Sequence, residues 1–318
     1  MQGVFLDLKS LDNSDIELTA LTAVLSNCNL FDSTTDMQVL ERIRPANVVI
    51  TNKVKLTATL LQAASQLKLV CVAATGTNNV DLDAAADLGI TVCNVRNYAT
   101  PSVVQHVFAL ILALTTRLPQ YQAAVMQGMW QKSPHFCLLD FPIAEMSGKA
   151  MGIIGYGVLG KAVAKVAEAF GMRVLIAARP GVKDVSEGRT ALPDLLAAAD
   201  IISLHCPLTV QTLGLIGERE LRCMKPNALI INTARGGIID ETALLSAVAQ
   251  HRIGGAGIDV LTNEPPAAGN PLLSVHLPNL IVTPHIAWSS REARQRLVNE
   301  ISLNIEAYLK GSPRNVVM

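Results

Sequence analysis

The chain alternates short apolar runs with longer segments whose apolar residues recur at helical spacing. In the first hundred residues, the runs that predict strands are residues 3–7, 48–52, 67–74 and 90–95. A second series of such runs comprises residues 150–155, 172–178, 200–206, 228–234, 254–260 and 279–285. Strands that alternate with helices are typical of parallel sheets with helices on both faces. The sequence therefore predicts an α/β fold of two doubly wound domains, and six strands are enough to complete the larger one.

Two further segments indicate where the domains meet along the chain. Residues 97–114 begin with turn residues and Pro101, which suit a helix start, and then run apolar for several turns. Residues 291–311 are charged, with apolar positions on one helical face, and we expect this helix to return to the first domain. The predicted division is a smaller flavodoxin-like substrate domain (residues 1–98 plus 287–318) and a Rossmann-type dinucleotide-binding domain (residues 99–286).

Charge and composition narrow the class of partner. The 318 residues include 26 basic and 26 acidic ones without a basic cluster, so the electrostatic footprint of a nucleic-acid-binding protein is missing. No apolar run reaches the roughly 18 to 20 residues that span a bilayer. The six cysteines form no CxxC pair and the start of the chain does not resemble a signal peptide. We expect a cytoplasmic protein with a small-molecule partner, and with no nucleic acid, membrane or metal ligand.

A glycine-rich motif lies between an apolar strand and an alanine-rich helix. Its spacing is GxGxxG, in which the first glycine allows a tight turn, the second lets the backbone approach a pyrophosphate and the third allows close helix packing. The phosphates would lie at the positive end of the helix. The predicted cofactor loop comprises Gly155, Tyr156, Gly157, Val158, Leu159 and Gly160.

The end of the next strand bears on the choice of cofactor. NAD-binding sheets usually carry there an Asp or Glu that binds the ribose 2′-hydroxyl, but this chain has Ala178 followed by Arg179. A guanidinium beside a missing carboxylate suits the 2′-phosphate of NADP. The alternative is that Arg179 stacks on adenine or faces solvent and that NAD is used. We expect NAD(P)(H) as cofactor and favour NADP(H).

Arg235, Glu264 and His285 each lie at or just past the carboxyl end of a predicted strand of the second domain. Ligands bind along that edge in open α/β sheets. Hydride transfer to a 2-keto acid requires a cation for the substrate oxygens and a proton donor for the forming alkoxide, which arginine and histidine supply. A carboxylate hydrogen-bonded to the imidazole would fix the ring and favour its protonated form. We therefore predict Arg235, Glu264 and His285 as catalytic residues.

Each of these side chains also has a plain structural interpretation. Arg235 could close a surface salt bridge, Glu264 could belong to an ordinary loop before two prolines, and His285 could cap a helix. Two other histidines have weaker settings. His205 follows a strand but precedes a proline turn, so we expect it to shape the wall of the cofactor groove. His106, on an apolar helix, is interpreted as a core residue with its hydrogen bonds satisfied.

Around these residues the chain resembles the D-2-hydroxyacid dehydrogenase family, most nearly its hydroxypyruvate reductase or glycerate dehydrogenase branch. The resemblance covers nearly the whole chain. It is carried by residues 74–82 (ATGTNNVDL), 97–106 (NYATPSVVQH), 152–164 (GIIGYGVLGKAVA), 205–209 (HCPLT), 232–241 (NTARGGIIDE), 257–266 (GIDVLTNEPP) and 283–288 (TPHIAW). Asn78 and Gln105 depart from the Asp and Glu of many relatives, and neither change removes a catalytic group.

The resemblance implies a role for each matched position. Arg235 would orient the substrate and polarise its 2-oxygen, His285 would be the acid and base, and Glu264 would tune His285. Asp259 would bind the carboxamide region of the nicotinamide. Backbone amides of the loop at Thr75, Gly76 and Thr77 would bind the substrate carboxylate. The remaining implied cofactor contacts are His205, Cys206, Pro207, Thr233 and Ala234. Trp288 is either a wall that limits substrate size or simple packing.

The predicted activity is hydride transfer between NAD(P)(H) and a small 2-keto or D-2-hydroxy acid, with hydroxypyruvate or glyoxylate as substrate. The alternative is a dinucleotide-sensing corepressor or scaffold with little turnover, against which the complete catalytic set argues. Formate oxidation is disfavoured because those relatives pair the histidine with glutamine. The apolar helix at residues 103–116 and the irregular segment 120–145, which resembles the dimer arm of the family, predict a homodimer.

Overall fold

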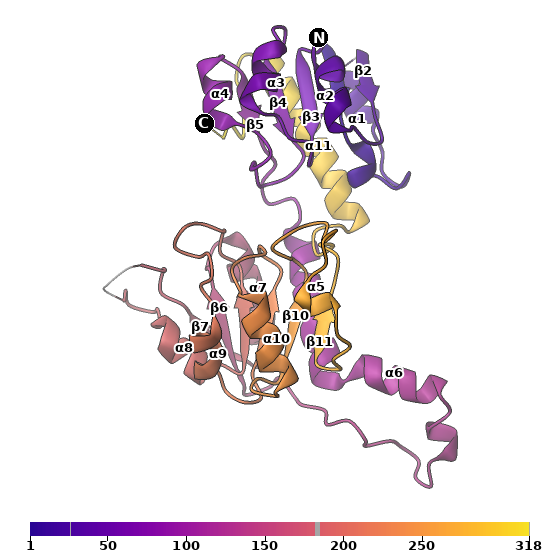
Figure 1. Ribbon diagram of the computed structural model, residues 1–318, viewed down its shortest axis with the longest axis vertical. Coiled ribbons are helices and arrows are strands. Elements are labelled where there is room, and N and C mark those ends of the chain that lie inside the picture. The colour runs from indigo at the N-terminus through magenta and orange to yellow at the C-terminus, as the bar shows by residue number, and fades with distance from the viewer. Residues whose placement is uncertain (26, 182–184, 318) are drawn as a thin grey trace. The chain divides into compact units, whose positions relative to one another are not determined.

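The chain forms two compact units, each built on one parallel sheet (Figure 1). The computed structural model describes residues 1–25, 27–181 and 185–317. Unit 1 comprises Met1–Ala99 and Trp288–Met318, and unit 2 comprises Thr100–Ala287. The two parallel sheets with their helices confirm the α/β fold that the sequence predicts.

Unit 1 contains a five-stranded sheet in the order β2–β1–β3–β4–β5, the order of flavodoxin-like folds. The strands are β1 (Gln2–Phe5), β2 (Asn27–Leu30), β3 (Val48–Thr51), β4 (Leu69–Val72) and β5 (Thr91–Cys93). Every residue of β3 and β4 is buried, because helices cover both faces. The strand order changes direction between β1 and β3.

The sequence pattern missed β2, and the structure shows why. This strand, NCNL, lies at the edge of the sheet and is mostly exposed. It is held by parallel backbone pairing with β1, from Gln2 opposite Asn27 to Phe5 opposite Leu30. A strand held by backbone pairing at an edge needs no buried apolar face, so it leaves no periodic signal in the sequence.

Helices cover both faces of the unit 1 sheet. The 3₁₀ helix η1 (Leu8–Ser10) follows β1. The helices are α1 (Thr19–Val24), α2 (Asp36–Ile43), α3 (Ala58–Ala63), α4 (Leu82–Asp87) and α11 (Arg291–Leu309). One buried cluster joins the sheet to α2, α3 and α4, and another joins it to α1 and α11. Leu297, Ile301 and Ile305 of α11 are fully buried, so the last helix belongs to this unit.

Unit 2 contains a six-stranded parallel sheet in the order β11–β10–β9–β8–β6–β7. The strands are β6 (Ala150–Ile154), β7 (Arg173–Ile176), β8 (Ile201–Leu204), β9 (Leu229–Asn232), β10 (Gly255–Ile258) and β11 (Leu280–Val282). The order differs from the 3-2-1-4-5-6 order of a complete dinucleotide-binding sheet. Beside β7, where the third strand of that order belongs, there is one parallel bridge between Ala177 and Thr190.

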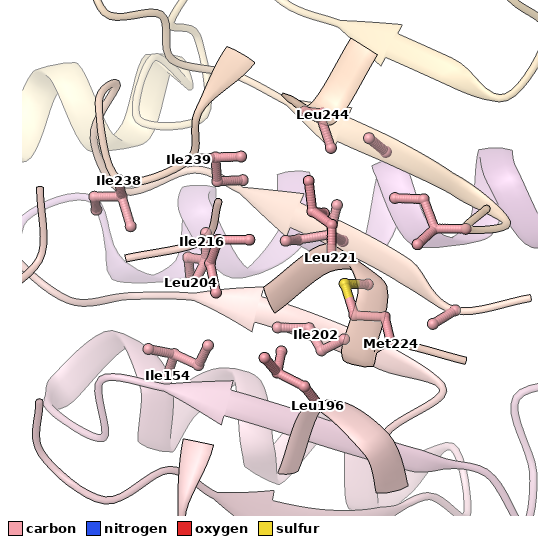
Figure 2. Packing of buried hydrophobic residues seen from close by; sticks show 14 of the residues in the cluster. Ile154, Leu196, Ile202, Leu204, Ile216, Leu221, Met224, Ile238, Ile239 and Leu244 are labelled. Carbon is pink, nitrogen blue, oxygen red and sulfur yellow. The ribbon is translucent and has the colours of Figure 1, made fainter. Parts of the chain in front are cut away.

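The helices of unit 2 form two layers. They are α5 (Thr100–Thr116), α6 (Leu118–Met126), α7 (Val158–Ala169), α8 (Leu192–Ala198), α9 (Glu218–Cys223) and α10 (Glu241–Ala249), with 3₁₀ helices η2 (Trp130–Lys132) and η3 (Pro271–Leu273). Helices α8, α9 and α10 close the apolar core in which Ile154, Ile202 and Leu204 meet Leu196, Leu221 and Leu244 (Figure 2). Helices α5 and α7 pack on each other. Helix α5 also packs against β9 and β10, and α7 packs against β6 and β7.

Helix α6 and the segment after it stand away from the rest of unit 2 (Figure 1). Within the described residues, none of the helices is by itself long and apolar enough to cross a membrane. The pair α5 and α6, bent by 60° at their junction, reaches that length and apolarity when the two are counted together.

Candidate active site

The three predicted catalytic residues follow three neighbouring strands of unit 2. Arg235 follows β9, Glu264 follows β10 and His285 follows β11. These strands pair in parallel, β9 with β10 and β10 with β11. Their carboxyl ends therefore lie at one edge of the sheet.

His285 and Glu264 form a direct pair. The distance from His285 Nδ1 to Glu264 Oε2 is 2.6 Å. The other carboxylate oxygen of Glu264 accepts the backbone N–H of Leu261 at 2.8 Å, which fixes the carboxylate to its own loop. His285 adopts a left-handed backbone with φ of 55°, an unusual conformation for a non-glycine residue, and its N–H donates to the Asp259 carbonyl at 2.8 Å. Since Ser290 is the N-cap of α11, His285 does not cap that helix.

Asp259 holds the segment that carries the imidazole. Its side chain is 1% exposed, and its carboxylate accepts the hydroxyl of Thr283 at 2.6 Å and the N–H groups of Ile286 and Ala287 at 2.9 Å. His106 lies beside this group, with Nε2 3.0 Å from Thr283 Oγ1 and 3.5 Å from Asp259 Oδ1. The hydrogen bonds expected for His106 are therefore made to this network. The contact of Asp259 with a nicotinamide carboxamide stays a prediction.

Arg235 lies on an exposed turn without an acidic partner. Its Nη1 donates to the Ala234 carbonyl at 2.7 Å, and no carboxylate in residues 1–25, 27–181 or 185–317 forms an ion pair with it. The salt-bridge interpretation of Arg235 is not supported there. Asn232 shapes the turn, accepting the Ala234 N–H at 3.0 Å and donating to the Arg235 carbonyl at 2.9 Å.

The Arg235 turn lies directly against the loop that carries Glu264. A Cβ atom at Gly236 would collide with the carbonyl oxygen of Leu261, so only glycine permits this approach. Because Leu261 is also the residue whose N–H anchors Glu264, the guanidinium-bearing turn and the carboxylate-bearing loop are packed as one piece.

Glu241 is hydrogen-bonded to two points of the same loop, a role that the sequence pattern does not indicate. Its Oε1 accepts the N–H and the hydroxyl of Thr262 at 2.7 and 3.0 Å, and its Oε2 accepts the Asn270 amide at 2.8 Å. Glu241 is the first residue of α10, directly after the N-cap Asp240. Its place in the NTARGGIIDE stretch was visible in the sequence, but its partners, 21 and 29 residues away, were not.

The glycine-rich loop has the shape that a dinucleotide pyrophosphate requires. Gly155 has φ of 95°, and a Cβ there would lie 2.5 Å from the backbone nitrogen of Cys206. Around Gly157, by contrast, a Cβ would meet nothing within 4 Å. Gly157 is the N-cap of α7 and no side chain caps this helix, so its first N–H groups are available to an anion. The loop therefore fits the predicted cofactor.

Two neighbouring strand ends carry buried polar atoms without partners among the described residues. These are Nδ1 of His205, after β8, and Oγ1 of Thr233, after β9. His205 Nε2 lies 2.9 Å from Ser203 Oγ, and burial lowers the pKa of His205 to about 4. Cys206 is buried next to it, and burial raises the pKa of its thiol. Unsatisfied buried polar atoms cost free energy, so their presence at this edge supports a polar ligand there.

The remaining predicted cofactor residues differ in burial. Ala234 is buried in the core, and the Pro207 carbonyl accepts the Thr212 hydroxyl at 2.6 Å. Tyr156 and Leu159 are partly exposed, and Val158 is 54% exposed on the first turn of α7. Arg179 is exposed just beyond β7.

In unit 1, the loop at residues 74–77 presents three consecutive backbone donors. Within the described part of the chain, the N–H groups of Thr75, Gly76 and Thr77 make no hydrogen bond. The loop is held from the other side, since the Thr75 hydroxyl donates to the Val95 carbonyl at 2.8 Å and the Asn94 amide donates to the Thr75 carbonyl at 2.7 Å. This arrangement suits a carboxylate ligand.

Trp288 packs in unit 1. Its ring meets Tyr98 edge to face, with 6.3 Å between centroids, and it lies against the core shared with α11. A role of Trp288 in limiting substrate size stays a prediction.

Comparison with known proteins now decides the family. Residues 108–287 match the model of the D-isomer specific 2-hydroxyacid dehydrogenase, NAD binding domain. The chain belongs to the D-isomer specific 2-hydroxyacid dehydrogenase family. This confirms the resemblance noted in the sequence and the expectation of an oxidoreductase with an NAD-binding domain.

Similar proteins cover the whole chain. Glycerate dehydrogenase of Methylorubrum extorquens is 46% identical over 99% of this chain and 98% of that protein. Hydroxypyruvate reductase of Blautia hydrogenotrophica is 38% identical over 100% of this chain and 99% of its own length. Among solved structures, an acyclic imino acid reductase in complex with NADPH and D-Arg superposes with a TM-score of 0.87 at 31% identity, covering 100% of both chains.

Proposed function

We propose that the protein reduces hydroxypyruvate or glyoxylate to the corresponding 2-hydroxy acid, the D isomer where C2 is chiral, or catalyses the reverse reaction. The observation that carries the proposal is the 2.6 Å pair of His285 and Glu264 packed against the Arg235 turn at one sheet edge. The names of the two similar sequences, glycerate dehydrogenase and hydroxypyruvate reductase, support this substrate class.

Each side chain has a task in this reaction. A bound nicotinamide cofactor supplies or accepts the hydride. Arg235 stabilises the negative charge that develops on the 2-oxygen, in a setting where no carboxylate of the described residues neutralises it. Glu264 holds Nδ1 of His285, so the imidazole donates its proton to the forming alkoxide from Nε2. We further propose that the amides of Thr75, Gly76 and Thr77 bind the substrate carboxylate.

Turnover on a panel of 2-keto acids tests the proposal. Purified protein is mixed with NADH or NADPH and with hydroxypyruvate, glyoxylate, pyruvate or phenylpyruvate, and the loss of absorbance of the reduced cofactor is followed. We expect the highest kcat/KM with hydroxypyruvate or glyoxylate. Tight binding of cofactor with negligible turnover of every acid would instead support the dinucleotide sensor and contradict the proposal.

We propose NADP(H) as the preferred cofactor. Ala178 stands at the strand end where a carboxylate would bind a ribose 2′-hydroxyl and repel a 2′-phosphate, and Arg179 follows it. A higher kcat/KM with NADPH than with NADH is expected, and the opposite preference would contradict this choice.

We also propose that the protein is a homodimer formed through the arm, which we define as residues 118–145. The arm exposes Leu118, Val125, Met126, Met129, Trp130, Phe136, Leu139 and Ile143, with Phe136 91% and Leu139 83% exposed. Apolar surface concentrated in this way is typical of a subunit interface. Sedimentation at micromolar concentration should show a dimer that Phe136→Ser with Leu139→Ser dissociates. A wild-type monomer would contradict the proposal.

A further inference from the structure

A second arginine lies at the end of β7, where the sequence motif shows only Arg179. The segment at residues 189–190 runs beside the strand end, with the Ala178 N–H donating to the Thr190 carbonyl and the Thr190 N–H to the Ile176 carbonyl, both at 2.8 Å. Arg189 Nη1 donates to the Ala177 carbonyl at 3.1 Å. These bonds fix the guanidinium at the carboxyl end of β7, although nine residues lie between Arg179 and Arg189 in the sequence.

Arg189 also lies beside the glycine-rich loop. Its Cζ is 5.6 Å from the ring centroid of Tyr156, which stands between the first two glycines of the motif. Lys161 of α7 approaches the same ring, with Nζ 5.9 Å from the centroid. Arg189 and Lys161 thus both lie beside Tyr156 of the glycine-rich loop. Arg179 directly follows Ala178, whose backbone N–H pairs with the residue after Arg189.

Among residues 1–25, 27–181 and 185–317, no carboxylate forms an ion pair with Arg179, Arg189 or Lys161. One N–H of Arg189 is used on Ala177, and a guanidinium carries five. A phosphate dianion is the ligand that suits planar guanidinium donors with no competing carboxylate.

We propose that Arg189, together with Arg179, binds the 2′-phosphate of NADP(H). The proposal rests on the proposed preference for NADP(H) over NAD(H), and Arg189 is the residue that would determine this preference. Arg189 acts as the fixed half of the site, because backbone pairing positions it before any ligand arrives. Arg179 is exposed and supplies the second guanidinium.

Binding of two nucleotide fragments tests this without turnover. Isothermal titration calorimetry measures the Kd of 2′,5′-ADP and of 5′-AMP, which differ by the 2′-phosphate alone. Wild-type protein should bind 2′,5′-ADP more tightly. In Arg189→Ala the ratio of the two affinities should fall about 10- to 100-fold, as expected when a charge-assisted hydrogen bond is lost, and Arg189→Lys should restore part of it. Arg173→Ala, an exposed arginine at the opposite end of β7, is the matched control and should leave the ratio unchanged.

Two outcomes overturn the inference. They are a wild-type protein that binds both fragments equally, and an Arg189→Ala variant that keeps the wild-type ratio while remaining folded by circular dichroism. The kcat/KM ratio for NADPH over NADH in Arg189→Ala gives a second readout and should fall in parallel. Absence of turnover on every 2-keto acid, with the fragment ratios as expected, would sink the proposed reaction while leaving the phosphate site intact.

Discussion

The two ends of the unit 2 sheet edge are organised in opposite ways. The end that carries the predicted catalytic residues, called here the catalytic end, lies beyond β9, β10 and β11. There, carboxylates hold the backbone in place. Asp259 accepts two backbone N–H groups and a hydroxyl, Glu264 accepts one N–H and contacts the imidazole, and Glu241 ties two points of one loop. At the nucleotide end, beyond β7, the described side chains near Tyr156 include Arg189 and Lys161, each without an ion pair.

The two ends differ in the source of the negative charge that their side chains contact. In the proposed mechanism, carboxylates of the chain fix His285 before substrate arrives, and such pre-organisation lowers the free energy of the transition state. At the proposed nucleotide end, Arg189 and Lys161 form no ion pair within the described residues, so the affinity of the proposed site should depend on the charge of its ligand. Carboxylate acceptors thus fix the proposed acid at one end, and cations without an ion pair among the described residues mark the proposed phosphate site at the other.

Removing the imidazole should produce the largest effect. We expect His285→Ala to lower kcat by about 10² to 10⁴, the usual contribution of a general acid, with cofactor affinity by fluorescence titration little changed. The loss belongs to kcat because His285 acts on the developing alkoxide. His276→Ala, an exposed histidine on a loop before β11, is the control. A near-normal kcat in His285→Ala would show that the catalytic end does not contain the acid.

His205, between the two ends, should give a smaller effect that depends on pH. Burial lowers its pKa from 6.5 to about 4. Between pH 6.5 and pH 4, His205 is therefore protonated in the unfolded chain and neutral in the folded protein. Stability therefore falls as pH drops through this window, by at most about 3 kcal/mol. Urea unfolding at pH 7 and pH 4.5 should show a smaller pH dependence in His205→Asn than in the wild type. The same pH dependence in both would mean that the ring is accessible to protons.

The sequence predicted most of this fold because apolar runs report buried strands. All six strands of unit 2 and four of the five strands of unit 1 coincide with such apolar runs, while β2 lacks an apolar face. The pairing of His285 with Glu264 was also predictable, since parallel strands deliver their following residues to one edge. The positions of Arg189 and Glu241 were not, because each depends on backbone pairing or loop packing that has no periodic signature.

Removing the hydrogen bonds that Glu241 makes to Thr262 and Asn270 should produce the smallest effect on activity and still distinguish the two ends. Glu241→Ala removes three hydrogen bonds to Thr262 and Asn270, and we expect hydrogen exchange of the peptide at residues 259–270 to speed up. The kcat should fall by about tenfold or less, since a net hydrogen bond is worth about 1 kcal/mol, while the affinity for 2′,5′-ADP at the other end stays unchanged. Glu241→Gln keeps an acceptor for Thr262 and should recover part of both losses.

If exchange accelerated without any change in kcat, the hydrogen bonds of Glu241 would stabilise the loop without positioning Glu264. If nucleotide affinity fell equally, the two ends would not be separable parts of the edge.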